Sequence, residues 1–238
     1  MTSNDAASPP GHEDIRHHFD VLLEDIRQGM VEMGSLVTEN VRRAGHAMVE
    51  NRTDMVEEVR AADAEVNSRY ATLEKKVFET LARQQPVARD LRFLVSATRI
   101  LYELERSGDL AVNCVNSMAR QDGFPNAPKL VGLLDQLVKA TAQVFSHGIE
   151  AIHEMDPQAG YTLETEDDVV DDLVGRYYNE IGRRSEEIGL ENAIAMSRVG
   201  RFLERIADHA VNVGENITYI VTAEFPGDTH AVLSDEAD

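Results

Sequence analysis

The sequence predicts an all-α protein of two tandem antiparallel three-helix bundles, six long helices in all, related by an internal pseudo-two-fold axis. The first observation is a repeat: "ELERSGDLAVN" at 103–113 returns as "FLERIADHAVN" at 202–212, with seven of eleven positions identical. The second is an apolar stripe on each copy with alternating steps of four and three residues. The third is composition, since 42 % of residues are hydrophobic but only 5 % aromatic, and none is Trp. This composition favours helices over a β-sandwich.

The stripes place both repeated segments on helices that pack in a bundle. The first stripe consists of Ala97, Leu101, Leu104, Gly108, Ala111, Val115 and Met118. The second consists of Met196, Gly200, Leu203, Ala207, Ala210, Gly214 and Ile217. Alternating steps of four and three keep such side chains on one helix face. We expect the small residues Gly108, Ala207 and Gly214 to let a neighbouring helix approach closely.

Turn and cap residues divide the first half into three helices, expected at 13–50, 53–84 and 86–120. Pro86 is expected at the start of the third helix, where its missing N–H group leaves no hydrogen bond unmade. The segment "QDGFPNAPK" at 121–129 combines Gly with two prolines and is interpreted as the linker between the repeats.

The second half follows the same plan, with helices expected at 129–154, 157–187 and 191–222, the middle one beginning at Asp156-Pro157. The domain organisation is therefore a first repeat at 13–120, the linker at 121–129, and a second repeat at 130–222. The polar ends, 1–12 and 223–238, are expected to be a disordered N-terminal tail and an acidic C-terminal tail.

Acidic and amide side chains four residues apart flank the stripes in both repeats. "ADAEVNSRY" at 62–70 matches "EDDVVDDLV" at 166–174, on the helix before each repeated segment. The oxygen-bearing side chains are Asp63, Asn67, Glu105 and Asp109 in the first repeat, and Asp167, Asp171, Glu204 and Asp208 in the second. Residues at i and i+4 share a helix face, where like charges repel by about 0.2–0.5 kcal/mol.

Two interpretations of these acids remain open from spacing alone. Four oxygen ligands from two helices suit a hard or borderline cation such as Mg²⁺, Mn²⁺, Fe or Zn²⁺. The alternative is a hydrated network at the edge of the stripe, in which Arg106 and Arg205 neutralise the acids.

Other features are weaker candidates for chemistry. Glu150 and His153 have the i, i+3 spacing of a ferritin-like ligand pair, but such a site needs two pairs and the sequence has one. His209 is interpreted either as an extra ligand or as a solvent-exposed or outer-sphere side chain, and Cys114 as a packed small side chain. The sequence has no GxxxxGK[ST], GxGxxG or GxSxG motif, which argues against a nucleotide fold or a nucleophile elbow.

Charge and hydropathy exclude several classes of protein. The 43 acidic and 23 basic residues give a formal charge of −20, the opposite sign to that of proteins that bind nucleic acid or anionic membranes. No apolar run reaches the roughly 18 residues that span a bilayer, and the N-terminus lacks the features of a signal peptide. With a single cysteine, we expect a cytoplasmic protein that binds no nucleic acid and does not insert into membranes.

Three segments resemble the PhoU family of phosphate-specific transport accessory proteins: "RQQPVARDLR" at 83–92, "LERSGDLAVN" at 104–113 and "LERIADHAVNVGENITYIV" at 203–221. With the acidic segments, the similarity covers about 16–222. It implies a pair of three-helix bundles that binds multinuclear metal clusters through E/D-x-x-x-D motifs. It also implies a negative regulator of phosphate uptake and phosphate-starvation signalling. Its partners would be the PstB-like ATPase of the phosphate ABC transporter and a PhoR-like sensor histidine kinase at the inner face of the membrane.

Carried over by position, the resemblance implies a metal-binding set in each repeat. The residues are Asp63, Asn67, Glu105, Asp109 and Asn113, and Asp167, Asp171, Glu204, Asp208 and Asn212. Asn67 stands where an acid is usual, and a neutral amide offers one carbonyl oxygen and no charge. The first site is therefore expected to hold its cation more weakly. The metal stays open among Fe, Zn, Mn and Mg, and a homodimer is expected.

Three classes of function follow from these features. The favoured one is a non-enzymatic, metal-stabilised helical adaptor that acts on a transporter ATPase and a kinase. The second is a carboxylate-bridged metalloenzyme, a hydrolase or ferroxidase, for which the motifs contain little histidine. The third is a purely structural bundle whose acids stay hydrated.

Overall fold

In the computed structural model, which describes residues 12–224, the chain forms six long α-helices, and the described part contains no strand. The helices are α1 (His12–Val49), α2 (Val56–Gln84), α3 (Ala88–Ala119), α4 (Pro128–Glu154), α5 (Ala159–Ile188) and α6 (Leu190–Thr222), with a short 3-10 helix, η1 (Thr53–Met55), before α2. The predicted all-α class is confirmed. None of the described helices is both long and apolar enough to cross a membrane. The predicted tails, 1–12 and 223–238, lie almost entirely outside the described residues, although α1 already includes His12.

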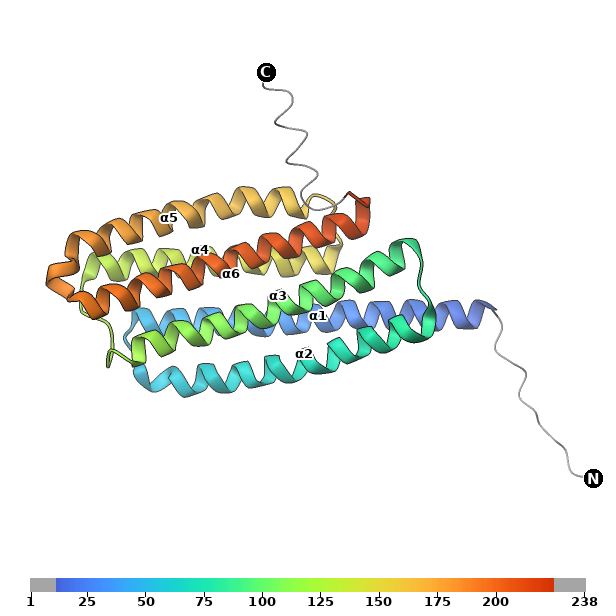
Figure 1. Ribbon diagram of the computed structural model, residues 1–238, viewed down its shortest axis with the longest axis horizontal. Helices are drawn as coiled ribbons and strands as arrows, with labels where there is room; N and C mark the ends of the chain where they lie inside the picture. The colour runs from blue at the N-terminus through green and yellow to red at the C-terminus, as the bar shows by residue number, and fades with distance from the viewer. Residues whose placement is uncertain (1–11, 225–238) are drawn as a thin grey trace, which may run out of the picture.

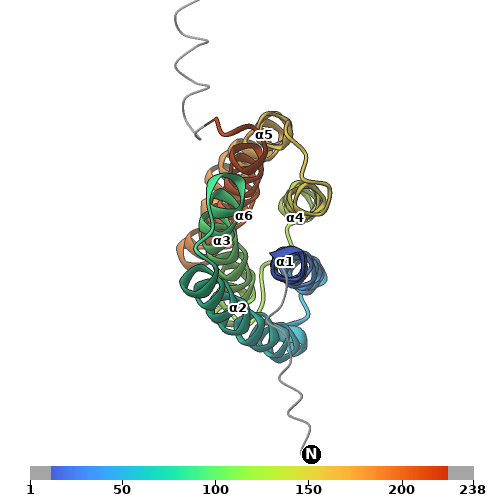
Figure 2. The same ribbon diagram turned by 90° about the vertical axis from the view of Figure 1, so that its right-hand side faces the viewer.

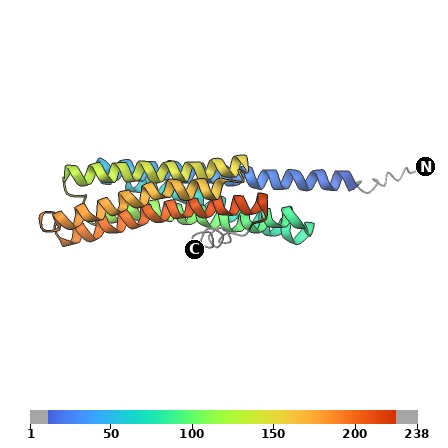
Figure 3. The ribbon, with the colours of Figure 1, turned by 90° about the horizontal axis from the view of Figure 1, so that it is seen from above.

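Each half of the chain forms an antiparallel three-helix unit, and the two units lie side by side (Figure 1). Helices α1, α2 and α3 contact one another, as do α4, α5 and α6. The units join where α3 packs against α6 and α1 packs against α4, so equivalent helices meet, as the pseudo-two-fold axis requires. Seen end-on, α1 and α4 lie on one side, and α2, α3, α6 and α5 form a curved layer on the other (Figure 2). The N-terminal part of α1 extends beyond the other helices (Figure 3).

Two predicted helix starts are wrong by two residues, because the proline lies in the connection and not in the first helical turn. Gln85 ends α2 with a left-handed φ of 47°, and Pro86 follows it before α3 begins at Ala88. In the second repeat, Pro157 lies in a turn and α5 begins at Ala159. A proline restricts the residue before it to extended or turn conformations, which suits a connection as well as a helix start.

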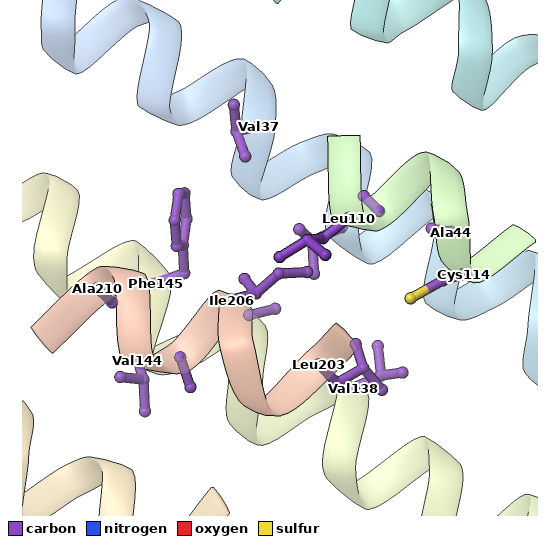
Figure 4. Close-up of a cluster of buried hydrophobic side chains, with 14 of the residues drawn as sticks. Val37, Ala44, Leu110, Cys114, Val138, Val144, Phe145, Leu203, Ile206 and Ala210 are labelled. Atoms are coloured by element: carbon purple, nitrogen blue, oxygen red, sulfur yellow. The ribbon is translucent and has the colours of Figure 1, made fainter. Parts of the chain in front are cut away.

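The core is continuous through the interface between the two units. Ile206 and Leu203 of α6, Leu110 of α3 and Phe145 of α4 are buried there, and their side chains gather between the helices (Figure 4). Cys114 of α3 is fully buried in the same region, which confirms its interpretation as a packed side chain. Burial of these apolar groups holds the two repeats together as one body.

Small residues set the closest approach of the helices that carry the acids. A Cβ atom at Gly108 would lie 2.5 Å from Oδ1 of Asp63, and one at Gly214 would lie 2.6 Å from Cδ1 of Leu163. The missing side chains therefore let α2 approach α3, and α5 approach α6, as predicted for these two glycines. Ala207 is fully buried on α6.

Candidate metal centres

The packing of α2 on α3 and of α5 on α6 brings together the acidic and amide side chains that lie four residues apart on each helix, here called the acid columns. The first acid cluster consists of Asp63 and Asn67 on α2 and Glu105 and Asp109 on α3. The second acid cluster consists of Asp167 and Asp171 on α5 and Glu204 and Asp208 on α6. The acids of α3 and α6 follow the apolar stripes of these helices by one residue, about 100° of helix, and therefore lie at the rim of the core.

In the second acid cluster, burial and mutual repulsion both favour the protonated carboxyl groups. Burial, followed by the carboxylates of Asp171 and Asp208, raises the pKa of Asp167 to about 7. Burial, followed by Glu204, raises the pKa of both Asp171 and Asp208. Oδ1 of Asp167 is buried and accepts no hydrogen bond from any described residue. Leaving such an oxygen unpaired is costly, so it is available to a cation.

The first acid cluster repeats this arrangement with one fewer charge. Asp63 is buried, and burial followed by the carboxylate of Asp109 raises its pKa. Burial, followed by Asp109, also raises the pKa of Glu105. Nδ2 of Asn67 donates a hydrogen bond to Oδ2 of Asp63 at 3.2 Å, whereas Oδ1 of Asp63 has no partner among the described residues. The amide thus takes over part of the role that a cation would have.

Two arginines offset part of the negative charge. Nη1 of Arg106 lies 2.8 Å from Oδ2 of Asp109, and Nη1 of Arg201 lies 2.6 Å from Oε1 of Glu204. The predicted pairing of Arg106 is therefore present, but in the second repeat Arg201 replaces the predicted Arg205. Arg205 has the same i, i+3 spacing to Asp208 as Arg106 has to Asp109, but it forms no ion pair in the described part of the chain, and its charge only opposes the rise in the pKa of Asp208. Neither ion pair includes the aspartates of α2 and α5.

The donor chemistry of both clusters fits an oxygen-ligated cation. Carboxylate and amide oxygens suit hard cations, and each cluster contains one buried carboxylate oxygen without a partner among the described residues. Across residues 12–224, no three Asp, Glu, His or Cys side chains are already gathered closely enough to hold an ion. Binding therefore requires the carboxylates to rotate toward one another.

The two asparagines predicted as further ligands have different surroundings. Asn113 is exposed on α3, one turn beyond Asp109. Nδ2 of Asn212 donates to Oε1 of Glu103 at 3.3 Å, across the interface between α3 and α6. The amide nitrogen of Asn212 is thus engaged with the other repeat, and only its oxygen remains for a metal ion.

A polar network between α3 and α6 has no counterpart in the sequence-based expectations. Oγ of Ser107 lies 2.9 Å from Nδ1 of His209, and Oε2 of Glu103 lies 3.5 Å from Nε2 of the same ring. His209 is buried, so its interpretation as a solvent-exposed side chain is wrong. Burial, followed by the charges of Arg205 and Arg106, lowers the pKa of His209 to about 4. The ring is therefore neutral near pH 7 and belongs to the interface.

The sequence does contain a signal for this network, in the positions where the repeats differ. With the spacing of the repeated segments, Glu103 matches Phe202, and Ser107 matches Ile206. His209 matches Leu110 in the same way. Polar residues in one copy thus face polar residues of the other copy across the pseudo-two-fold axis. Of their apolar equivalents, Leu110 and Ile206 are buried in the core and Phe202 packs against it.

Comparison with known proteins agrees with this two-repeat organisation. The family model of the PhoU domain matches residues 30–118 and 134–217, which include both acid clusters. The chain belongs to the PhoU family. The two matched stretches correspond to the two three-helix units, so each unit is one PhoU domain.

Relatives within the PhoU family cover nearly the same length. The "Phosphate-specific transport system accessory protein PhoU homolog" of a Synechocystis strain is 30 % identical over 213 residues, 88 % of this chain and 93 % of the relative. Its Deinococcus radiodurans namesake is 31 % identical over 87 % of this chain and 98 % of the relative. The crystal structure of PhoU from Pseudomonas aeruginosa superposes with a TM-score of 0.81 at 25 % identity, covering 87 % of this chain and all of that one. For PhoU from Streptococcus pneumoniae the TM-score is 0.77 at 23 % identity, over 87 % and 98 %.

Proposed function

We propose that this PhoU-family protein is a non-enzymatic accessory regulator that restrains phosphate uptake and phosphate-starvation signalling. Its relatives are named accessory proteins of a phosphate-specific transport system, which supports a regulatory role. The proposed partners are a PstB-like transporter ATPase and a PhoR-like sensor histidine kinase, met in the cytoplasm at the inner face of the membrane. The elongated helical layers support an adaptor, because they offer long faces for docking (Figure 3).

We further propose that both acid clusters bind divalent or trivalent cations, Fe, Zn, Mn or Mg. The observation that carries this proposal is that Asp63 and Asp167, at equivalent positions of the two repeats, each keep a buried carboxylate oxygen without a partner among the described residues. Asp171, Glu204 and Asp208 complete the second site, and Asn67, Glu105 and Asp109 the first. A bound cation supplies positive charge that links the two helices of a pair and reverses the repulsion between their carboxylates.

The metalloenzyme alternative has no specific observation in its favour. His209, the histidine next to Asp208, is buried with both ring nitrogens beside Ser107 and Glu103, so it is not directed into the acid cluster. The relatives' names describe accessory proteins, which also supports an adaptor.

A deletion strain tests the regulatory role. In cells grown with abundant phosphate, loss of this protein is expected to raise phosphate uptake and to switch on a phosphate-starvation reporter. The measurement is uptake of labelled phosphate beside reporter activity, with the gene restored as the control. Unchanged uptake and reporter activity, in a strain with no second family member, would contradict the proposal.

Metal analysis of protein purified without chelator tests the cation sites. Elemental analysis by mass spectrometry is expected to find metal in the wild type and less in a variant with Glu204→Gln and Asp208→Asn. The matched control carries Glu65→Gln and Asp172→Asn, two exposed acids on α2 and α5 that lie outside the columns. Equal metal content in all three proteins would reject the proposed ligands.

A further inference from the structure

The repeat duplicates a pair of large apolar side chains that face solvent. Leu91 and Val95, near the start of α3, are 42 % and 40 % exposed. Their equivalents at the spacing of the repeated segments, Leu190 and Ile194 on α6, are 73 % and 45 % exposed. Single exposed apolar residues are ordinary on a protein surface. The same pair at the same place in both repeats is a recurring surface feature.

Each pair is followed by an arginine that has no acidic partner among the described residues. Arg99 lies one turn beyond Val95, and Arg198 lies one turn beyond Ile194; both are exposed. Acids outnumber bases by 43 to 23 in this chain, yet neither guanidinium forms an ion pair within the described part. We name Leu91, Val95 and Arg99 the α3 patch, and Leu190, Ile194 and Arg198 the α6 patch. Along the α6 patch the surface is hollowed into a shallow depression beside Ile194 and Arg198.

Both patches lie on the same face of the molecule. Helix α3 contacts α1, α2 and α6, and helix α6 contacts α4, α5 and α3, so each has its free side on the outer face of the curved layer (Figure 2). The two helices are antiparallel and begin at opposite ends of that layer (Figure 1). The contact of Ser107 with His209 sets their register. With a rise of 1.5 Å per residue, the patch centres are roughly 40 Å apart.

We propose that the α3 patch and the α6 patch are two equivalent docking surfaces for the two subunits of one homodimeric protein. Each subunit would offer an apolar hollow with carboxylates at its rim, to receive the leucine, the β-branched side chain and the arginine. A two-fold partner matches the pseudo-two-fold relation of the patches, and carboxylates match the unpaired guanidinium groups. The inference rests on the proposed function, because a transporter's pair of ATPase subunits is such a dimer.

Binding to the purified ATPase dimer of the phosphate transporter from the same genome tests this inference. Light scattering is expected to show one wild-type chain per ATPase dimer. The variants Leu91→Asp with Val95→Asp, and Leu190→Asp with Ile194→Asp, each remove one patch and are expected to weaken binding by about 10²-fold, because two linked contacts become one. The four changes together are expected to abolish binding. The matched control, Val21→Asp with Tyr161→Asp, changes equally exposed apolar residues on α1 and α5 and is expected to bind like the wild type.

The other possible results distinguish a failure of the docking surfaces from a failure of the proposed function. Unchanged binding by the patch variants would overturn the docking surfaces and leave the proposed function standing. Loss of binding through one patch only would overturn the equivalence of the two. Variants that bind normally but lose self-association would assign the patches to a second copy of this chain. Failure of the wild type to bind the ATPase would overturn both the inference and the ATPase as partner. Circular dichroism checks that each variant keeps its helices.

Discussion

Asp63 and Asp167 are the residues at which stability and binding conflict in this protein. Each lies at the rim of the core with one carboxylate oxygen buried and without a partner among the described residues. An unsatisfied buried carboxylate typically costs free energy of folding, about 1–3 kcal/mol or more for a charged group. The fold keeps one at the equivalent position in each repeat, which is expected when a ligand supplies the missing interaction.

The titration of Asp167 provides a test at the residue scale. Its folded-state pKa of about 7 lies above the ordinary 3.8, so the folded protein holds this proton more tightly than the unfolded chain. That contribution to stability is complete below about pH 4 and is lost as the pH rises through about 7. In metal-free protein, Asp167→Asn is therefore expected to raise the melting temperature at pH 7.5 by a few degrees more than at pH 5. A difference between variant and wild type that stays constant with pH would contradict this assignment.

Gly108 tests the close approach that places Asp63. In Gly108→Ala the new Cβ would lie 2.5 Å from Oδ1 of Asp63, so the buried carboxylate or α2 must move. We expect a loss of about 1–3 kcal/mol in the free energy of unfolding, measured by urea denaturation. The control is Gly182→Ala on α5, where a Cβ meets nothing within 4 Å and helix propensity predicts a gain of up to about 1 kcal/mol. Equal stability of the Gly108 variant and the wild type would show that the close approach of α2 to α3 does not require a glycine at this position.

At the scale of elements, the polar network pairs α3 with α6 and not with a second α3. Glu103 and Ser107 come from one repeat, His209 and Asn212 from the other, and their contacts cross the interface. Two copies of α3 would place leucine where the histidine lies, and would leave buried polar groups unpaired. The differences between the repeats thus favour the pairing seen within one chain.

A double-mutant cycle measures this network. Ser107→Ala and His209→Leu are each expected to cost about 1–3 kcal/mol, because each leaves a partner unsatisfied. Together they should cost less than the sum, by about 0.5–3 kcal/mol. His209→Leu combined with Thr80→Val is the control, because Thr80 is buried on α2, which does not pack against α6. Additive costs for Ser107 and His209 would show that their contact contributes nothing.

At the scale of the whole molecule, the internal repeat made most of the fold predictable. The six helices, their grouping in threes and the facing of the acid columns follow from apolar spacing along the chain, which is local information. The helix starts predicted at Pro86 and Pro157 were two residues too early, because proline suits a connecting turn as well as the first turn of a helix. The polar network between α3 and α6 was not predicted. Along the chain, Glu103 and Ser107 look like ordinary polar residues of a helix, and their role becomes visible only when the position of α6 is known. Whether the clusters hold cations depends on side-chain rotation, which spacing does not specify.

The most direct measurement of the central claim is the melting temperature with and without excess chelator. Cations bound between α5 and α6 should link the two helices and stabilise the folded protein, so chelation is expected to lower the melting temperature of the wild type. Asp208→Asn with Glu204→Gln should abolish most of that sensitivity. Glu105→Gln with Asp109→Asn should remove less, because Asn67 already weakens the first site. If the wild type is insensitive to chelator and the neutralised variants melt higher, the acids are only a hydrated, repulsive edge and the two clusters bind no metal.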